Sequence, residues 1–468
     1  MMFQAAAEVI GFPVDQTRYI TLLLLSYPLA YVFRYALHPS HTSLITRHIF
    51  SLSFGLLFGF LCFGSQMIVL FAIIGVCYAM LQYLPATVVQ RYTMVWAMGS
   101  MSAAHIYRMM TDYGGWSLDF TGPLMIIVQK VTLVAFALHD GKGRSDSSLN
   151  QDQREQKIDV CPSPLEYFTY IFNFHSFLAG PSFSIKDFLA FMDGSNLKFL
   201  NNPNQFAKAK EHVREPSAVF AVVSKLVYSL VSMVGFTILA SRYTEEMAID
   251  PQYSIFVRTY IITFAVLKHR LKYYFVWYMA DSINNLCGLG FSGYDEKGQP
   301  KWDITTNAFP TNVELASNPR DIFANWNICS AIWLRRVCYE RVPFSPTIAT
   351  FALSAWWHGF YPGYYLCGLF FGFTSEAARK MRRLVRPHFQ SSLLLKWSYD
   401  VITMLLTRLY MDYTIASFIL MYIGSGMLFW SYFYFIPNII IFVIVFLFPS
   451  GKSKEGRESK ETRRPKAD

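Results

Sequence analysis

The stretch Phe351-Ala-Leu-Ser-Ala-Trp-Trp-His-Gly-Phe-Tyr-Pro-Gly-Tyr-Tyr-Leu-Cys-Gly-Leu-Phe370 places one ionisable side chain, His358, in a segment apolar enough to lie in a bilayer. An ionisable group there is costly unless it faces the interior of a helix bundle or a wet cavity, so His358 indicates a functional site. Gly359, Pro362 and Gly363 predict a helix break directly after it. The alternative is a neutral histidine that serves only the helix junction.

The composition of the 468-residue chain extends this interpretation to the whole sequence. Hydrophobic residues make up 53% and charged residues only 15%, unlike a soluble domain. Apolar stretches that approach the ~20 residues of a membrane-crossing helix lie near 19–33, 48–63, 66–83, 88–110, 122–138, 220–240, 256–280, 346–378, 399–422 and 427–448. Segments 165–179 and 327–338 are shorter or more polar, and we expect them to be re-entrant, interfacial or buried. The sequence predicts an all-α polytopic membrane protein with about ten to twelve membrane helices.

The net charge of +10 is concentrated near the C-terminus. One basic block covers residues 379–386 and another the tail 451–468, and two predicted spans separate them. By the positive-inside rule both blocks are cytosolic. We expect one membrane domain over residues 1–450 and a basic cytosolic tail without fixed structure. No recognition module accompanies the basic blocks, so no nucleic-acid partner is expected.

Metal and disulfide chemistry have no support in the cysteine pattern. The seven cysteines are scattered and form no Cys-x-x-Cys pair, so neither a zinc site nor a disulfide framework is predicted. No Gly-x-Ser-x-Gly elbow, P-loop or zincin motif is present either. The sequence does not define an oligomeric state.

A second polar residue, Asn327, lies in Ala324-Asn-Trp-Asn-Ile-Cys-Ser-Ala-Ile-Trp-Leu-Arg-Arg336. Pro343 and Pro346 fall almost midway between Asn327 and His358, and such a pair ends one helix and permits the next. Two helical arms of ~20–24 Å would bring Asn327 and His358 to similar depth. Taken by itself, Asn327 is more typical of an ordinary helix N-cap.

A buried histidine and asparagine can together catalyse direct transfer to a hydroxyl. A neutral imidazole accepts the proton of the attacking hydroxyl as a general base. An asparagine amide donates to a developing oxyanion or holds the nucleophile in line. The pair therefore predicts transfer without a covalent enzyme intermediate.

Two motifs resemble the membrane-bound O-acyltransferase family, namely a Trp-His-Gly histidine deep in the membrane and an upstream asparagine in a Trp-Asn context. They stand here as Trp357-His358-Gly359 and as Trp326-Asn327 followed by Trp333-Leu334. Within the family the chain is most similar to the lysophospholipid acyltransferase branch, and there to the lysophosphatidylethanolamine and lysophosphatidylserine acyltransferases. The branch resemblance rests on residues 288–293, Lys301-Trp302-Asp303, Asn307, Glu314 and 333–341. It covers about residues 11–449 and implies helices arranged around a central tunnel.

The resemblance implies specific roles. His358 would be the general base that deprotonates the free glycerol hydroxyl of lysophosphatidylethanolamine, lysophosphatidylserine or lysophosphatidylcholine, and Asn327 would position that hydroxyl or the thioester carbonyl. The donor would be a long-chain acyl-CoA, with oleoyl-CoA expected, entering from the cytosol as a co-substrate without any permanently bound cofactor. The setting would be phospholipid remodelling in the membrane of the endoplasmic reticulum.

Further substrate contacts are expected around this pair. The candidates are Trp326, Trp333, Arg335, Arg336, Trp357 and His175. The arginines, with Arg341, could bind the phosphates of CoA. An i,i+4 ion pair between Arg336 and Glu340 would explain them equally well, and a hydrogen-bonded core position would explain His175.

Other polar residues receive no catalytic role. His105 and His139 lie in or beside spans without a recognisable partner, while Lys301-Trp302-Asp303, Asn307 and Glu314 are expected to hold the polar segment together.

Two other functions stay open. A protein or peptide acyltransferase of the same family would differ in its acceptor pocket. A transporter could use His358 in a proton relay, but transporters usually show several intramembrane charges and repeats, and here that polar set looks small.

Overall fold

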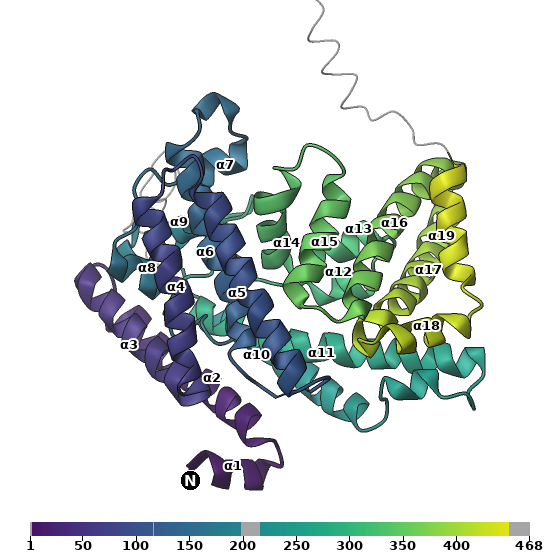
Figure 1. The fold of residues 1–468 in the computed structure, drawn as a ribbon, viewed down its shortest axis with the longest axis horizontal. Helices are drawn as coiled ribbons and strands as arrows, with labels where there is room; N and C mark the ends of the chain where they lie inside the picture. The colour runs from purple at the N-terminus through teal and green to yellow at the C-terminus, as the bar shows by residue number, and fades with distance from the viewer. Residues whose placement is uncertain (1, 116, 198–215, 449–468) are drawn as a thin grey trace, which may run out of the picture.

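The computed structural model describes residues 2–115, 117–197 and 216–448, so the predicted cytosolic tail 451–468 lies outside the described residues. Helices dominate these residues (Figure 1). The first part of the chain forms α1 (Met2–Ile10), α2 (Val14–Tyr35), α3 (Leu44–Phe63), α4 (Gln66–Tyr83), α5 (Val89–Thr111), α6 (Thr121–Lys142), α7 (Gln151–Gln156), α8 (Pro164–Phe172) and α9 (Ile185–Asp193).

The remaining elements follow the gap at residues 198–215. They are α10 (Val219–Ala240), α11 (Ile255–Cys287), β1 (Phe291–Tyr294), β2 (Pro300–Trp302), α12 (Pro310–Glu314), α13 (Pro319–Asn325), α14 (Ile328–Leu334), a π-helix (Arg335–Tyr339), α15 (Pro346–His358), α16 (Pro362–Val385), α17 (Leu393–Leu420), α18 (Ile423–Ser431) and α19 (Ile436–Leu447). In Figure 1, α11 runs along the lower side of the molecule, while α16, α17 and α19 stand together at one end.

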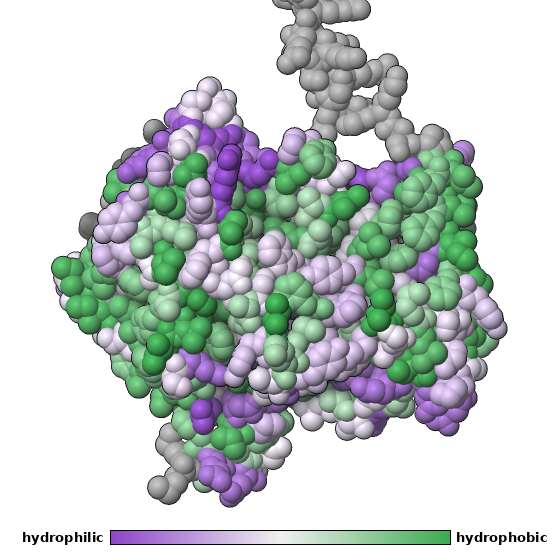
Figure 2. Space-filling view, viewed as in Figure 1, coloured by the Kyte–Doolittle hydropathy of each residue, from purple (hydrophilic) through white to green (hydrophobic). Residues whose placement is uncertain are grey.

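Several helices are suited to a bilayer. Among the described residues, α3, α4, α6 and α10 each combine at least 18 residues with a strongly apolar 18-residue stretch. The all-α, multi-pass prediction is confirmed, and α4 has the predicted bounds, but ten to twelve crossings stay a prediction. Figure 2 shows apolar side chains over much of one face, with polar side chains gathered at the edge formed by α7.

Two predicted spans are in fact pairs of helices. The stretch 427–448 divides into α18 and α19, which meet at an angle of 89°. Tyr434 and Phe435 between them adopt positive φ angles of 52° and 55°, which an α-helix cannot continue through. The stretch 346–378 divides into α15 and α16 at the break that Gly359 and Pro362 predicted.

Burial differs sharply between the membrane helices. In α6, 72% of the apolar stretch is buried inside the protein, against 11% in α10. The main hydrophobic core gathers side chains of α2–α6, α8, α9 and α11, and Trp333 and Trp357 belong to it. The central helix α6 therefore lies beside the elements that carry the two predicted catalytic residues.

A buried charge cluster fixes the short helix α12. The Arg270 guanidinium binds Glu314, with Nε 2.8 Å from Oε1, and also binds Asp412, with Nη1 2.9 Å from Oδ1. Arg408 binds the same two carboxylates. The four charges balance, which is what allows their burial. Glu314 therefore holds the polar segment to α11 and α17, as expected.

Candidate active site

The predicted helical hairpin is confirmed. α14 and the π-helix form its first arm, the turn contains Pro343, and α15 forms the second arm from Pro346. Asn327 directly precedes the first arm and His358 ends the second, so both lie at the end away from the turn. The rings of Trp333 and Trp357 connect the arms, with centroids 5.8 Å apart.

The imidazole of His358 lies among aromatic rings. Its centroid is 4.6 Å from that of Trp357, 6.0 Å from Tyr364 on α16 and 5.0 Å from Phe418 on α17. The side chain is only half-buried. Among the described residues, its ring nitrogens have no hydrogen-bonding partner, and neither is fully enclosed. An accessible nitrogen without a protein partner is what a general base requires.

The backbone at His358 is held by the neighbouring helices. His105 of α5 lies with its Nε2 3.2 Å from the carbonyl oxygen of Trp357, and the indole N–H of Trp357 donates to the carbonyl oxygen of Met125 at 2.9 Å. Gly359 has a φ of 121°, and a Cβ there would lie 3.4 Å from the His105 ring. The partner of His105 is thus a backbone carbonyl, which no pattern of residue types in the sequence can reveal.

Asn327 adopts a left-handed conformation with φ 50° and ψ 49°, which asparagine tolerates better than most residues. It occupies the N-cap position of α14, but its side chain makes no capping hydrogen bond. The cap comes from Asn307, whose Oδ1 accepts from the backbone N–H of Cys329 at 2.9 Å. Asn307 Nδ2 in turn donates to Asn327 Oδ1 at 3.2 Å. The N-cap alternative therefore describes the position of Asn327 but not the work of its side chain.

The two predicted catalytic residues do not bond to each other. Among the described residues, no hydrogen bond joins Asn327 to His358, and the Asn327 amide nitrogen has no partner. Asn327 is half-buried like His358. Each residue therefore keeps a polar group available for a third molecule.

The predicted tryptophans pack in different surroundings. Trp326 lies against Tyr274 and Trp277 of α11, with ring centroids 5.5 and 4.8 Å away. Trp333 is fully buried, and its indole N–H donates to Thr132 Oγ1 at 2.9 Å. Trp333 thus holds α14 against α6. Trp326, the residue directly before Asn327, packs against α11.

His175 is buried in the segment between α8 and α9. Its Nδ1 lies 2.8 Å from Asn284 Oδ1, and Phe174 and Phe191 flank its ring. Its Nε2 is enclosed without a hydrogen-bonding partner among the described residues. The core-histidine alternative therefore explains Nδ1, which has a hydrogen-bonding partner, but not Nε2, which has none among the described residues.

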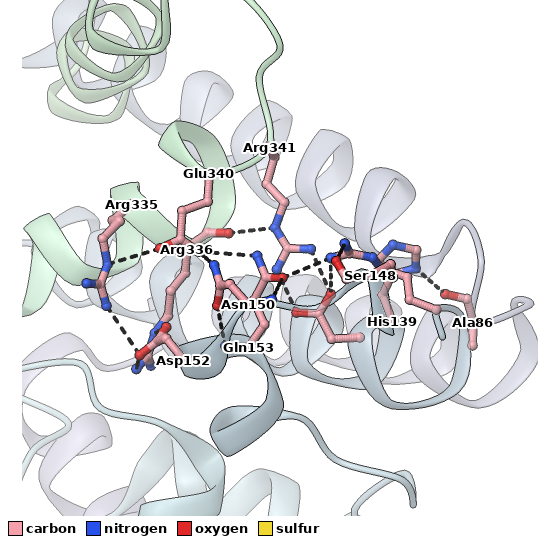
Figure 3. A network of polar contacts seen from close by, with 12 residues as sticks. Ala86, His139, Ser148, Asn150, Asp152, Gln153, Arg335, Arg336, Glu340 and Arg341 are labelled. Atoms are coloured by element: carbon pink, nitrogen blue, oxygen red, sulfur yellow. Dashed lines mark hydrogen bonds and ion pairs between the residues drawn. The ribbon is translucent and has the colours of Figure 1, made fainter. Parts of the chain in front are cut away.

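The arginines after α14 bind a carboxylate of α7, Asp152, and one at the end of α6, Asp140 (Figure 3). Arg336 binds Asp152 through two contacts of 2.8 Å. Arg341 binds Asp140 through contacts of 2.7 and 2.6 Å. Arg335, the most exposed of the three, lies 3.2 Å from Asp152. Although burial opposes ionisation of Asp152, Arg336 and Arg335 hold its pKa below the usual range.

The predicted Arg336–Glu340 ion pair is wrong. Glu340 instead lies 3.5 Å from Arg335. The reason is the π-helix, in which the backbone N–H of Glu340 donates to the Arg335 carbonyl oxygen at 3.0 Å. The i→i+5 spacing of this turn aligns residues five apart rather than four. His139, assigned no partner from sequence, lies beside this cluster with its Nδ1 2.8 Å from the carbonyl oxygen of Ala86.

These features define an integral multi-pass helical membrane protein with a polar site at a helix break. The profile of the membrane-bound O-acyltransferase family matches residues 20–423, and the chain belongs to this family. It is therefore an acyltransferase enzyme.

Three relatives place the chain within the family. It is 40% identical to lysophospholipid acyltransferase 6 of Drosophila melanogaster over 96% of this chain and 63% of that protein. It is 37% identical to human membrane-bound glycerophospholipid O-acyltransferase 1 over 95% of this chain and 91% of that protein. It is 35% identical to human membrane-bound glycerophospholipid O-acyltransferase 2 over 98% of this chain and 90% of that protein. The chain thus spans less than two thirds of the fly relative but nine tenths of the human ones.

Proposed function

We propose that this chain transfers a long-chain acyl group from acyl-CoA to the free glycerol hydroxyl of a lysophospholipid. The observation that carries the proposal is the half-buried imidazole of His358, whose nitrogens have no hydrogen-bonding partner among the described residues. The names of the relatives support a lipid acceptor, since they refer to lysophospholipids and glycerophospholipids.

The reaction balances with His358 and Asn327 alone. His358 accepts the proton of the glycerol hydroxyl while its oxygen attacks the thioester carbonyl carbon. The Asn327 amide donates to the oxyanion that develops on the carbonyl oxygen. The C–S bond then breaks, CoA leaves as a thiolate, and the imidazolium returns the proton to the sulfur. The products are a diacyl phospholipid and free CoA.

The finer assignments follow the sequence. The acceptor would be lysophosphatidylethanolamine, lysophosphatidylserine or lysophosphatidylcholine, and the donor oleoyl-CoA, entering from the cytosol into a central tunnel. The protein would lie in the membrane of the endoplasmic reticulum as one domain over residues 1–450, with the tail 451–468 cytosolic. Arg270 of α11 is paired with Asp412 of α17 and Glu314 of α12, so this cluster offers no support for the transporter alternative.

The test is an acyltransferase assay on microsomes that contain this chain. Labelled oleoyl-CoA is supplied with each of the three lysophospholipids, or with a serine-containing peptide, and His358→Ala is compared with the exposed-histidine control His388→Ala. We expect phospholipid product with the wild type and the control, and none with His358→Ala. Acylation of the peptide alone would instead favour the protein acyltransferase alternative. Equal turnover by His358→Ala at equal expression would refute the general-base role.

A further inference from the structure

Asn307 contacts both residues that begin α14 as well as Asn327. Its backbone carbonyl oxygen accepts from Ile328 N–H at 2.9 Å, and its side-chain Oδ1 accepts from Cys329 N–H at 2.9 Å. Its Nδ2 donates to Asn327 Oδ1 at 3.2 Å. Asn307 is buried, and the next residue, Ala308, forms a β-bridge with Trp326. The segment around Asn307 is therefore clamped against the segment around Asn327.

These contacts determine which way the Asn327 amide faces. A backbone N–H can only donate, so the Asn307 atom facing Cys329 must be the oxygen. The Asn307 atom facing Asn327 is then the NH₂ group, which can only donate. Asn327 must meet it with its own oxygen, and its NH₂ group is turned away from Asn307. The Cys329 N–H thus sets the orientation of the Asn307 amide, which in turn sets that of the Asn327 amide.

The outward amide of Asn327 has the polarity that acyl transfer needs. A developing oxyanion is stabilised by a donor that is oriented before the reaction begins. The reversed amide would present an oxygen to the oxyanion and repel it. We propose that Asn307 is a positioning residue, which holds the Asn327 NH₂ group toward the thioester carbonyl. This inference rests on the acyl-transfer function proposed above.

Asn307→Asp separates this role from helix capping. The aspartate keeps an oxygen for the Cys329 N–H, so the cap of α14 survives. It has no donor for Asn327, and its carboxylate attracts the Asn327 NH₂ group, which reverses that amide. The matched control is Asn312→Asp. Asn312 also donates its Nδ2 to an asparagine oxygen, that of Asn325 at 3.0 Å, but it is exposed.

The assay measures kcat and KM for lysophospholipid, together with the melting temperature in detergent. We expect Asn307→Asp to lower kcat at least ~10-fold with KM close to wild type, while Asn312→Asp changes neither kcat nor KM. The unpaired carboxylate at this buried position should also lower the melting temperature. Burial without a cationic partner raises the pKa of the new carboxyl, so it gains a proton, and with it a donor, as the pH falls from about 8 to about 5. The ratio of mutant to wild-type kcat should therefore rise toward acid.

Two outcomes would overturn the proposal. One is wild-type kcat for Asn307→Asp, which would leave Asn307 with a capping role while the acyltransferase assignment stands on the wild-type activity. If Asn307→Asp does not fold, Asn327→Asp decides instead. That variant still accepts from Asn307 Nδ2 but presents oxygen outward, so its kcat should fall at least ~10-fold. Normal turnover by a folded Asn327→Asp would equally refute the donor role.

Discussion

The two ends of the α14–α15 hairpin differ in how completely their polar groups are bonded. Near the turn, Arg336 and Arg341 each bind a carboxylate through two contacts. At the open end, His358 and Asn327 each keep a polar group without a partner among the described residues. Polar groups with hydrogen-bonding partners hold segments together, whereas a polar group without a partner at an accessible position is available for chemistry. The comparison predicts that substitutions at the open end reduce turnover and those near the turn reduce stability.

The largest expected effect is that of His358→Gln. Glutamine keeps a polar side chain of similar reach but cannot act as a base, so kcat should fall roughly 10²- to 10⁴-fold. The melting temperature should stay near the wild-type value, because the imidazole makes no hydrogen bond that would be lost. Steady-state kinetics and thermal unfolding in detergent measure both. A large loss of stability would remove the contrast between the two ends.

Gly359→Ala should lower both kcat and the melting temperature. Its φ of 121° is unfavourable for any residue with a Cβ, at a cost of about 1–3 kcal/mol. The added methyl group would also press on the His105 ring. We expect a lower melting temperature and a kcat reduced about 10-fold through displacement of His358. Gly424→Ala is the control, because a Cβ there meets nothing within 4 Å. Wild-type kcat in Gly359→Ala would show that the break tolerates movement.

Arg336→Ala should destabilise the protein without slowing the chemical step. It removes two charge-assisted hydrogen bonds and leaves Asp152 with Arg335 alone, at a cost of about 1–3 kcal/mol. Thermal unfolding should show the loss, while kcat for lysophospholipid acylation stays unchanged. If kcat falls at unchanged stability, Arg336 belongs to the substrate site after all.

The same ion pair predicts a pH dependence of stability. The folded state lowers the pKa of Asp152 from its ordinary value of 3.8. The ionised carboxylate therefore stabilises the fold at every pH above the ordinary pKa. The contribution is lost as the pH falls through the lowered pKa. The melting temperatures of wild type and Asp152→Asn should therefore differ by a constant amount near neutrality and converge below about pH 4. A gap that instead widened toward acid would contradict the assignment.

The smallest expected effect is that of Arg335→Ala. Its side chain is 47% exposed, and an exposed ion pair contributes little to stability. If Arg335 also binds a CoA phosphate, KM for acyl-CoA should rise about 3- to 5-fold, while kcat and the melting temperature stay unchanged. An unaltered KM would place Arg335 with the purely structural arginines and sharpen the contrast between the ends.

Hydropathy and the positions of proline and glycine predicted much of this fold from the sequence. The apolar length of α4, the proline turn of the hairpin and the break at Gly359 are local properties, and each was confirmed. The bond between His105 and the Trp357 carbonyl joins positions that lie far apart in sequence, so no local pattern could predict it. Asn307 stood out only through the family resemblance. Its bond to Asn327 depends on an antiparallel pairing that a single β-bridge defines.

The π-helix has a consequence for insertions and deletions. A π turn contains one residue more than an α turn, so deleting Val337 could restore a regular α-helix without disrupting the backbone. The bond from the Glu340 N–H to the Arg335 carbonyl oxygen would become an ordinary i→i+4 bond, so Arg341 would still face Asp140. A single-residue deletion should thus be tolerated better here than in a regular α-helix, where it would rotate every later side chain by about 100°.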